Sequence, residues 1–527
     1  MFLPLAAIAL IPNFIWNSLD HTPWPWDQAW YGEVSVDLWF ALTHSIIGWA
    51  KAMGTAIGMK PPGIVWLGQL FVPLGSLFGS IENALLLSVL AVQALTLYVI
   101  FRIGRCIAPS SYLVPALGVS MAAAAQSFTG LSHEFFVEPM QAFAIAWVVL
   151  IVIRCREWPT ARIVIHSLAA LTLGVLAKAT TPLYCLLPGI YLGFVLLRKP
   201  LAEGWREEWR SVPERLLIIS IGGCVPATAG WYWINVRAVW EHVRFSSSGE
   251  MAASNYGFHA SIGRKLMVWL KLLDQSFLAP YLAVTLLLAV VIGLAARYRS
   301  GGKRPLPAGT AVAALLCGLQ CAFLLLIFAA NDAVDARYMY GMLPLLATIG
   351  MTVSAPIRSR TALAAMIAVC VLQFAAVHRV AFGAGSLSNP FAWLKKPDQD
   401  RTHYDEMERI VATTSSVPNR YNIVGVEEPW LSSNTASFFA AKRRLHTGVR
   451  DFYTTLGYAQ KDLAAAVQRV KEFNLSYYIS LDERFQPAPP NFVNIVSLPM
   501  LRQIRMDPQF EQVPFVNMDG VVIFRHR

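Results

Sequence analysis

The chain is organised around His21 to Asp37, which reads HTPWPWDQAWYGEVSVD and directly follows the first apolar segment. It holds three acids, Asp27, Glu33 and Asp37, and it is rich in Trp and Tyr. Acidic groups beside a membrane segment are costly unless they face water, a partner or a reaction. Interfacial Trp and Tyr hold such a loop at the level of the lipid headgroups. We therefore predict that this loop forms the rim of a functional site just outside a bilayer.

The composition is that of a polytopic α-helical membrane protein. Of the 527 residues, 56% are hydrophobic and 14% are charged, whereas a soluble protein carries about 25% charged residues. The net charge of +11 raises a nucleic-acid hypothesis, but the basic residues gather in short loops between apolar runs, which is the pattern of membrane topology. We expect no nucleic-acid partner. The seven cysteines lie in or beside apolar segments, and we interpret Cys317 and Cys321, which are four residues apart, as core-filling residues rather than a metal site.

Apolar runs near the ~20 residues needed to cross a bilayer recur through the first 380 positions, and about eleven to thirteen helices are expected. The expected spans are 2–19, 81–101, 111–130, 137–153, 163–177, 182–197, 216–234, 277–296, 308–330, 339–356 and 361–380. The arginine-rich loops between them are cytoplasmic under the positive-inside rule. The acidic loop, Lys178 and the segments 132–138, 235–275 and 331–337 then lie on the opposite side.

The remaining segments are assigned by composition. Residues 32–58 and 63–80 are expected to lie along the membrane surface or to re-enter it. We divide the chain into a transmembrane domain, 1–380, with a first extracytoplasmic loop at 20–80, and a small extracytoplasmic α/β domain, 381–527. In the second domain, helix-like stretches (402–413, 457–473) alternate with strand-like ones (421–426, 477–481, 492–498, 513–525).

The acids of the first loop are the leading candidates for chemistry. Asp27 is expected to accept a proton or position an acceptor hydroxyl, and the alternative is that it caps a helix. Glu33 and Asp37 are four residues apart and share a helix face. They could bind a cation or a polar substrate, or they could be ordinary exposed acids.

Three cations are candidates for binding a phosphate. Lys60 precedes two prolines that hold it on a non-helical turn, and the alternative is a lysine that snorkels to the membrane surface. Lys178 lies between two apolar runs, where an unpaired charge is expensive. Arg337 could clamp a phosphate or pair with Asp335 or Asp332.

Polar groups in two further segments could line the same site. SHEFFVEP, residues 132–139, carries His133, Glu134 and Glu138, which could cap a helix, bind an acceptor or hold a cation. Arg244 could line an anionic pocket together with Arg264, Lys265 and His259. The polar stretch at 246–257 could close over a substrate. No cofactor is certain, and a divalent cation is possible.

At these positions the chain resembles the lipid-linked class C glycosyltransferases, which include bacterial lipid A aminoarabinose transferases and protein O-mannosyltransferases. The resembling motifs keep the family's order along roughly residues 1–380. They are Asp27–Glu33, Lys60–Pro62, Glu138–Pro139, Leu176–Lys178, Gly230–Tyr232 and Arg337–Pro344. Two departures are Gln28, which replaces an acid, and Met59, which stands where aminoarabinose transferases carry a glutamate associated with metal binding.

The resemblance implies a transferase of the bacterial inner membrane that uses a polyprenyl-phosphate sugar at the outer face. Asp27 would be the catalytic carboxylate, with Glu33 and Glu138 as further acidic site residues. Lys60, Lys178, Arg337 and Tyr338 would contact the donor phosphate. The acceptor would be lipid A, another glycolipid, a polysaccharide or a protein, and a single displacement would invert the anomeric centre. The alternatives are a flippase of lipid-linked sugars and a lipid-binding assembly protein whose tail carries the function.

Overall fold

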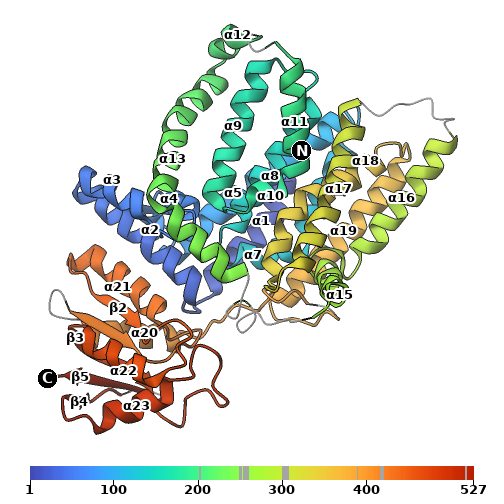
Figure 1. Cartoon of the computed structure of the whole chain (residues 1–527). Helices are drawn as coiled ribbons and strands as arrows, with labels where there is room; N and C mark the ends of the chain where they lie inside the picture. The colour runs from blue at the N-terminus through green and yellow to red at the C-terminus, as the bar shows by residue number, and fades with distance from the viewer. Residues whose placement is uncertain are drawn as a thin grey trace. The chain divides into compact units, whose positions relative to one another are not determined.

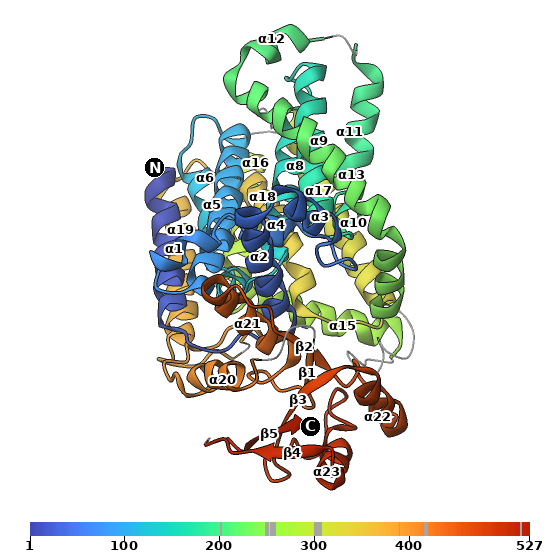
Figure 2. The ribbon, with the colours of Figure 1, turned by 90° about the vertical axis from the view of Figure 1, so that its left-hand side faces the viewer.

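The computed structural model describes residues 1–527 except 201–202, 248–251, 253–259, 300–307, 389, 416–419 and 517–518. The described chain is mostly helical, with one five-stranded sheet near its C-terminus (Figures 1 and 2). It divides into two compact units. The first unit comprises Met1–Ser18, Met53–Leu67 and Leu86–Lys396, and the second comprises Leu19–Ala52, Gly68–Leu85 and Pro397–Arg527. The acidic loop thus belongs to the unit that contains the sheet. The predicted domain boundary at residue 380 stays a prediction.

The first unit is built from long and broken helices. They are α1 (Phe2–Leu19), α4 (Gly63–Gly68), α5 (Ile81–Ile107), α6 (Leu113–Ala124), α7 (Gln126–Ser132), α8 (Glu138–Arg154), α9 (Thr160–Ala177), α10 (Thr181–Tyr184), α11 (Leu186–Arg198), α12 (Trp205–Arg210), α13 (Val212–Ser247), α15 (Ile262–Leu273), η2 (Asp274–Leu278), α16 (Leu282–Arg299), α17 (Ala308–Ala330), η3 (Ala336–Met342), α18 (Leu343–Ser354) and α19 (Arg360–Ala381). The first residues of α5 and the last residues of α1 and α4 fall in the second unit.

The expected helical membrane fold is confirmed. Within the described residues, six helices are long and apolar enough to cross a membrane: α1, α5, α9, α13, α17 and α19. A seventh arises if α15–η2 and α16, which bend by 87°, form one span. The predicted spans at 111–130, 182–197 and 339–356 are each interrupted, and they fold as the pairs α6/α7, α10/α11 and η3/α18. A break shortens a helix without changing its hydropathy, so composition alone does not reveal it.

Buried glutamines satisfy the backbone at two of these breaks. On α17, Gln320 accepts a hydrogen bond from the Leu187 amide (2.9 Å) and donates to the Leu183 carbonyl (2.8 Å). On α19, Gln373 accepts from two amides at the start of α16, at 2.7 and 2.8 Å. An unsatisfied backbone group in hydrocarbon costs several kcal/mol. These glutamines therefore make the interrupted helices stable.

The second unit combines surface helices with a mixed sheet. Its elements are α2 (Trp26–His44), most of α3 (Ile46–Thr55), η1 (Val72–Ser76), α20 (Thr402–Thr413), β1 (Tyr421–Val424), α21 (Ser433–Thr447), β2 (Phe452–Thr455), α22 (Leu463–Glu472), β3 (Leu475–Leu481), α23 (Ser497–Met506), β4 (Phe510–Val513) and β5 (Val521–His526). The strand order is β2-β1-β3-β5-β4. Strands β2, β1 and β3 are parallel, whereas β5 and β4 continue the sheet in antiparallel fashion.

The sheet has a hydrophobic core on each face. One core joins Met407 and Ile410 of α20 and Phe439 of α21 to the strands. The other joins residues of α22 and α23 to the opposite face, with Val470 and Leu501 among them. The predicted α/β character of the tail is therefore confirmed.

One predicted strand, 492–498, is wrong. Its apolar and β-branched residues favour a strand, but the structure places two turns there, followed by α23. The Asn494 side chain accepts from the Glu427 amide (2.8 Å) and from the Ser497 hydroxyl (3.0 Å). These side-chain hydrogen bonds replace the ladder that a strand would need.

Candidate active site

Lys178 lies at the break after α9 and pairs with Glu138 at the start of α8. The backbone of Lys178 is extended (φ −156°, ψ 130°), and the Thr181 hydroxyl donates to the Gly174 carbonyl (2.7 Å) to complete the end of the helix. Lys178 Nζ lies 2.8 Å from Glu138 Oε1. The lysine side chain is 19% exposed and the glutamate side chain 2%. The ammonium group can therefore be reached by a ligand, whereas its carboxylate partner cannot.

Arg337 is fixed by the acid that caps η3. Asp335 accepts from the Arg337 amide (2.9 Å) and from Arg337 Nε (2.8 Å), so the ion pair that the sequence left open is present. The guanidinium group lies 4.7 Å from the ring centroid of Phe136 and 5.4 Å from that of Trp393. Stacking and pairing together hold the guanidinium plane in one orientation.

Tyr338 joins the lysine and the arginine in one cluster. Lys178 Nζ lies 4.4 Å above the centroid of the Tyr338 ring, and the Tyr184 hydroxyl donates to the Tyr338 carbonyl (2.8 Å). The Glu138 carboxylate interacts electrostatically with both Lys178 and Arg337. The structure therefore brings together four predicted site residues from three separate segments. This cluster is well suited to bind an anion because its partly exposed groups are cationic.

The turn that carries Lys60 packs beside the end of α9. Pro61 and Pro62 are buried, and Lys60 is half-buried. A Cβ atom added to Gly63 would lie 2.6 Å from the Leu176 carbonyl oxygen. Only glycine permits this close approach. This contact places the backbone at Gly63, shortly after Lys60, against Leu176, which lies two residues before Lys178.

The acidic loop of the second unit is held by the start of α21. The Thr435 hydroxyl donates to the Trp24 carbonyl (2.8 Å), and Asn434 Nδ2 donates to the Trp26 carbonyl (3.1 Å). Trp26 has φ +33°, a conformation that is costly for a bulky residue. The two hydrogen bonds stabilise this conformation immediately before Asp27, so they fix the backbone direction from which the candidate catalytic acid projects.

The alternative that Asp27 caps the helix is wrong. Pro25 occupies the N-cap of α2, with φ −84° and ψ 155° and no side-chain capping bond. Asp27 is half-buried in the first helical turn, where the helix dipole favours a carboxylate.

The two other acids of α2 differ sharply in environment. Asp37 accepts from Arg444 (2.7 Å) and pairs with Arg450 (3.1 Å), so two arginines of the tail neutralise its charge. Burial, and secondly the nearby Asp37 charge, raises the pKa of Glu33 to about 8. At neutral pH Glu33 is therefore protonated, and it can donate a hydrogen bond but cannot act as a general base.

This pKa predicts a pH-dependent effect of the substitution Glu33→Gln. Protonated Glu33 stabilises the folded state, and that contribution is lost as the pH rises from the unfolded pKa near 4.5 through about 8. The amide cannot ionise. We expect the variant to gain at least about 3 °C in melting temperature over the wild type between pH 5 and pH 9.

The measurement is thermal unfolding of both proteins at pH 5, 7 and 9. The isosteric substitution Glu472→Gln, at the exposed end of α22, serves as control and is expected to show no such trend. A constant offset between Glu33→Gln and wild type at every pH would contradict the assignment.

Two of the predicted site residues have other surroundings. The buried His133 ring stacks on Trp16, with centroids 3.7 Å apart, and its Nε2 lies 3.0 Å from Asn13 Oδ1. Arg244 is exposed near the end of α13. Among the described contacts, none joins His133 or Arg244 to the cluster that Glu138, Lys178, Arg337 and Tyr338 form. Most of the predicted closing stretch 246–257, and also His259, lie outside the described residues.

The side chains of segment 132–139 do not converge on a metal. Glu134 pairs with Lys395 (3.0 Å) and Glu138 pairs with Lys178. Across the part of the chain that the structure describes, no three His, Cys, Asp or Glu side chains are arranged to hold a metal ion. The residues present therefore do not fit a metal site, and no step is assigned to one.

Sequence reasoning missed the residues that position the candidates. Tyr184 and Trp393 support the cluster in the first unit, whereas Asn434, Thr435 and Arg444 hold the acidic helix in the second. None of them lies in a motif, and their roles depend on contacts with distant segments.

Solved structures that are similar to this chain share its architecture over nearly its whole length. ArnT from Cupriavidus metallidurans in the apo state is 15% identical with a TM-score of 0.59, and the match covers 99% of this chain and 97% of that chain. The same protein bound to undecaprenyl phosphate is 14% identical with a TM-score of 0.58 and the same coverage. The chain has the class C glycosyltransferase fold. The predicted fold class is thereby confirmed.

The class C fold is evident in three dimensions and not in sequence comparison. No family model matches the sequence, and no curated protein matches it. An oligosaccharyltransferase from Archaeoglobus fulgidus, in complex with Zn and sulfate, aligns at 12% identity with a TM-score of 0.49, covering 92% of this chain and 68% of that chain.

Proposed function

We propose that this protein is a membrane glycosyltransferase that transfers a sugar from a polyprenyl-phosphate donor to an acceptor of the cell envelope. The observation that carries the proposal is the match, over nearly the full length of both chains, to ArnT bound to undecaprenyl phosphate. The cluster of partly exposed cations in the first unit supports it, because a lipid phosphate needs such partners.

Lys178, Arg337 and Lys60 would contact the donor phosphate. Negative charge grows on this phosphate as the bond to the sugar breaks, so donors held in place before the reaction lower the barrier. Glu138 would hold the Lys178 side chain in position, and Asp335 would hold that of Arg337. Tyr338 would shape the same pocket through its contact with Lys178.

Asp27 would orient the acceptor hydroxyl and take up its proton as the oxygen attacks the anomeric carbon. A single displacement inverts the configuration at that carbon. Glu33, protonated at neutral pH, would donate a hydrogen bond to the acceptor or to the sugar. Asp37 would hold α2 against α21 through Arg444, and against the segment that follows α21 through Arg450.

The acceptor would be lipid A, another glycolipid, a polysaccharide or a protein, met at the outer face of the bacterial inner membrane. The sidedness rests on the arginine-rich loops, which mark the cytoplasmic side. The sheet-containing domain would then lie in the periplasm.

The test is a transfer assay with the purified protein in liposomes. Undecaprenyl-phosphate-linked hexoses and pentoses are supplied with lipid A, a polysaccharide or an envelope protein extract, and new glycosidic bonds are detected by mass spectrometry. The expected result is a sugar-bearing acceptor together with released undecaprenyl phosphate. Movement of the donor lipid across the bilayer without any new glycosidic bond would overturn the proposal in favour of a flippase.

A further inference from the structure

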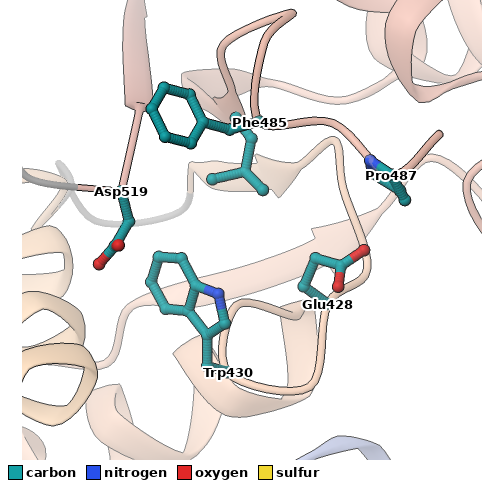
Figure 3. A pocket seen from close by; sticks show the side chains of 6 residues that line it. Glu428, Trp430, Phe485, Pro487 and Asp519 are labelled. Carbon is teal, nitrogen blue, oxygen red and sulfur yellow. The ribbon is translucent and has the colours of Figure 1, made fainter.

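A cavity of about 180 Å³ lies in the sheet-containing domain, at the carboxyl ends of β1 and β3. Its lining comes from the last residue of β3 and from three loops, which follow β1, follow β3 and precede β5. The lining residues are Glu428, Trp430, Leu481, Phe485, Pro487 and Asp519 (Figure 3). All six belong to the second unit, and none is used by the proposed transfer chemistry.

The topology of the sheet explains why a cavity forms here. The chain leaves β1 for α21, which covers one face of the sheet, and leaves β3 for α23, which covers the other face. The loops after two adjacent parallel strands therefore diverge. Ligands of open α/β sheets bind in the crevice that such a change of direction leaves at the carboxyl ends of the strands.

The aromatic walls of the cavity are held in place. The His403 ring stacks on Trp430, with centroids 4.5 Å apart and planes inclined by 21°. The Phe485 ring packs on the backbone of Gly520, because a Cβ atom there would lie 2.1 Å from the ring. Gly520 also has φ +71°, which favours glycine. Figure 3 shows Trp430 between the two carboxylates, with Phe485 opposite.

The two carboxylates are also positioned by neighbours. Asn494 Nδ2 donates to Glu428 Oε1 (3.2 Å), and Asp519 Oδ2 lies 3.4 Å from His403 Nε2. The six lining residues include acids but no base. Such a lining repels phosphate and other anions, and it offers acceptors for ligand hydroxyl groups.

We propose that this cavity binds one sugar ring of an envelope glycan. An aromatic face accommodates the C–H face of a sugar ring, while flanking carboxylates accept hydrogen bonds from its hydroxyl groups. With about 180 Å³, the cavity has room for a single ring. The residues that line the cavity are not those of the cation cluster, so the site binds the glycan without taking part in bond formation.

The experiment is saturation-transfer NMR on the full-length protein in nanodiscs, with the methyl α-glycosides of glucose, galactose and mannose as probes. Saturation transfer to at least one glycoside is expected. We expect Trp430→Ala to reduce it about fivefold or more and Trp430→Phe to keep at least about half of it. The control Tyr458→Ala removes an exposed aromatic residue of the same domain that does not line the cavity, and it should leave the signal unchanged.

The far-UV circular dichroism and melting temperature of each variant show that the domain remains folded. Absence of saturation transfer to all three glycosides overturns the proposal, and so does transfer that persists in Trp430→Ala. Competition by inorganic phosphate, or binding of tetramethylammonium in place of the glycosides, also overturns it. This binding assay needs no sugar transfer, so its outcome is independent of the proposed enzymatic activity.

Discussion

Replacing Asp27 by Asn is expected to lower the turnover number for sugar transfer by about 10³-fold or more, with little change in stability. A positioned general base contributes about 10²–10⁴-fold, and an amide of the same shape cannot take up the acceptor proton. The helix start survives the substitution because Pro25, and not Asp27, occupies the N-cap. The backbone of Trp24 and Trp26 stays held by Thr435 and Asn434. The measurement is the initial rate of transfer in liposomes at saturating donor.

The matched control is Asp462→Asn, since Asp462 is an exposed acid whose side chain caps α22 by accepting from the Ala464 amide (2.8 Å). An Asn can make the same cap, so its activity should equal that of the wild type. Unimpaired turnover in Asp27→Asn would remove this residue from the mechanism. A loss of folded protein that accounts for the loss of activity would contradict the expected unchanged stability.

Replacing Lys178 by Met is expected to have the second large effect, and it acts on two properties at once. The substitution removes a phosphate contact, so we expect kcat/KM to fall about 10²-fold or more. It also leaves the Glu138 carboxylate, 2% exposed, without its partner. Breaking a buried ion pair costs about 3 kcal/mol or more. Unfolding in denaturant and transfer kinetics measure the two losses separately.

The double variant Lys178→Met/Glu138→Gln distinguishes stability from function. The uncharged Gln removes the orphaned charge, and replacing both members of a buried pair is often close to neutral, so stability should return to within about 1 kcal/mol of the wild type. Activity should remain about 10²-fold low, because the donor phosphate still lacks the ammonium group. Recovery of activity together with stability would show that Lys178 has only a structural role.

The control for the Lys178 and Glu138 variants is Arg237→Met. This substitution breaks an ion pair with Glu241 in which both side chains are exposed. Exposed pairs contribute about 0–1 kcal/mol, so neither stability nor activity should change appreciably. A comparable destabilisation at this position would indicate a general sensitivity of the helices to loss of charge.

Much of the candidate site was predictable because its signals are local. Lys178 stands out as a charge between apolar runs, and Arg337 has an acid two residues before it. Asp335 was accordingly expected as a possible partner of Arg337, whereas Glu138 was a candidate as an acid at a helix start, and only the structure shows that it pairs with Lys178. The tail was harder to interpret. Arg444 and Thr435 lie in an ordinary amphipathic stretch, and nothing in that stretch indicates that they contact Asp37 and Trp24.

The class of protein, the positions of the apolar segments and the α/β character of the tail follow from the amino-acid sequence alone. Hydropathy, charge and turn residues act over a few neighbours, so they can be read along the chain. Only the tertiary structure decided which apolar segments break, which acids are paired and where the sheet leaves a cavity. Those features depend on contacts between residues far apart in sequence: the glutamines that satisfy broken helices, the arginines that neutralise Asp37, and the diverging loops after β1 and β3.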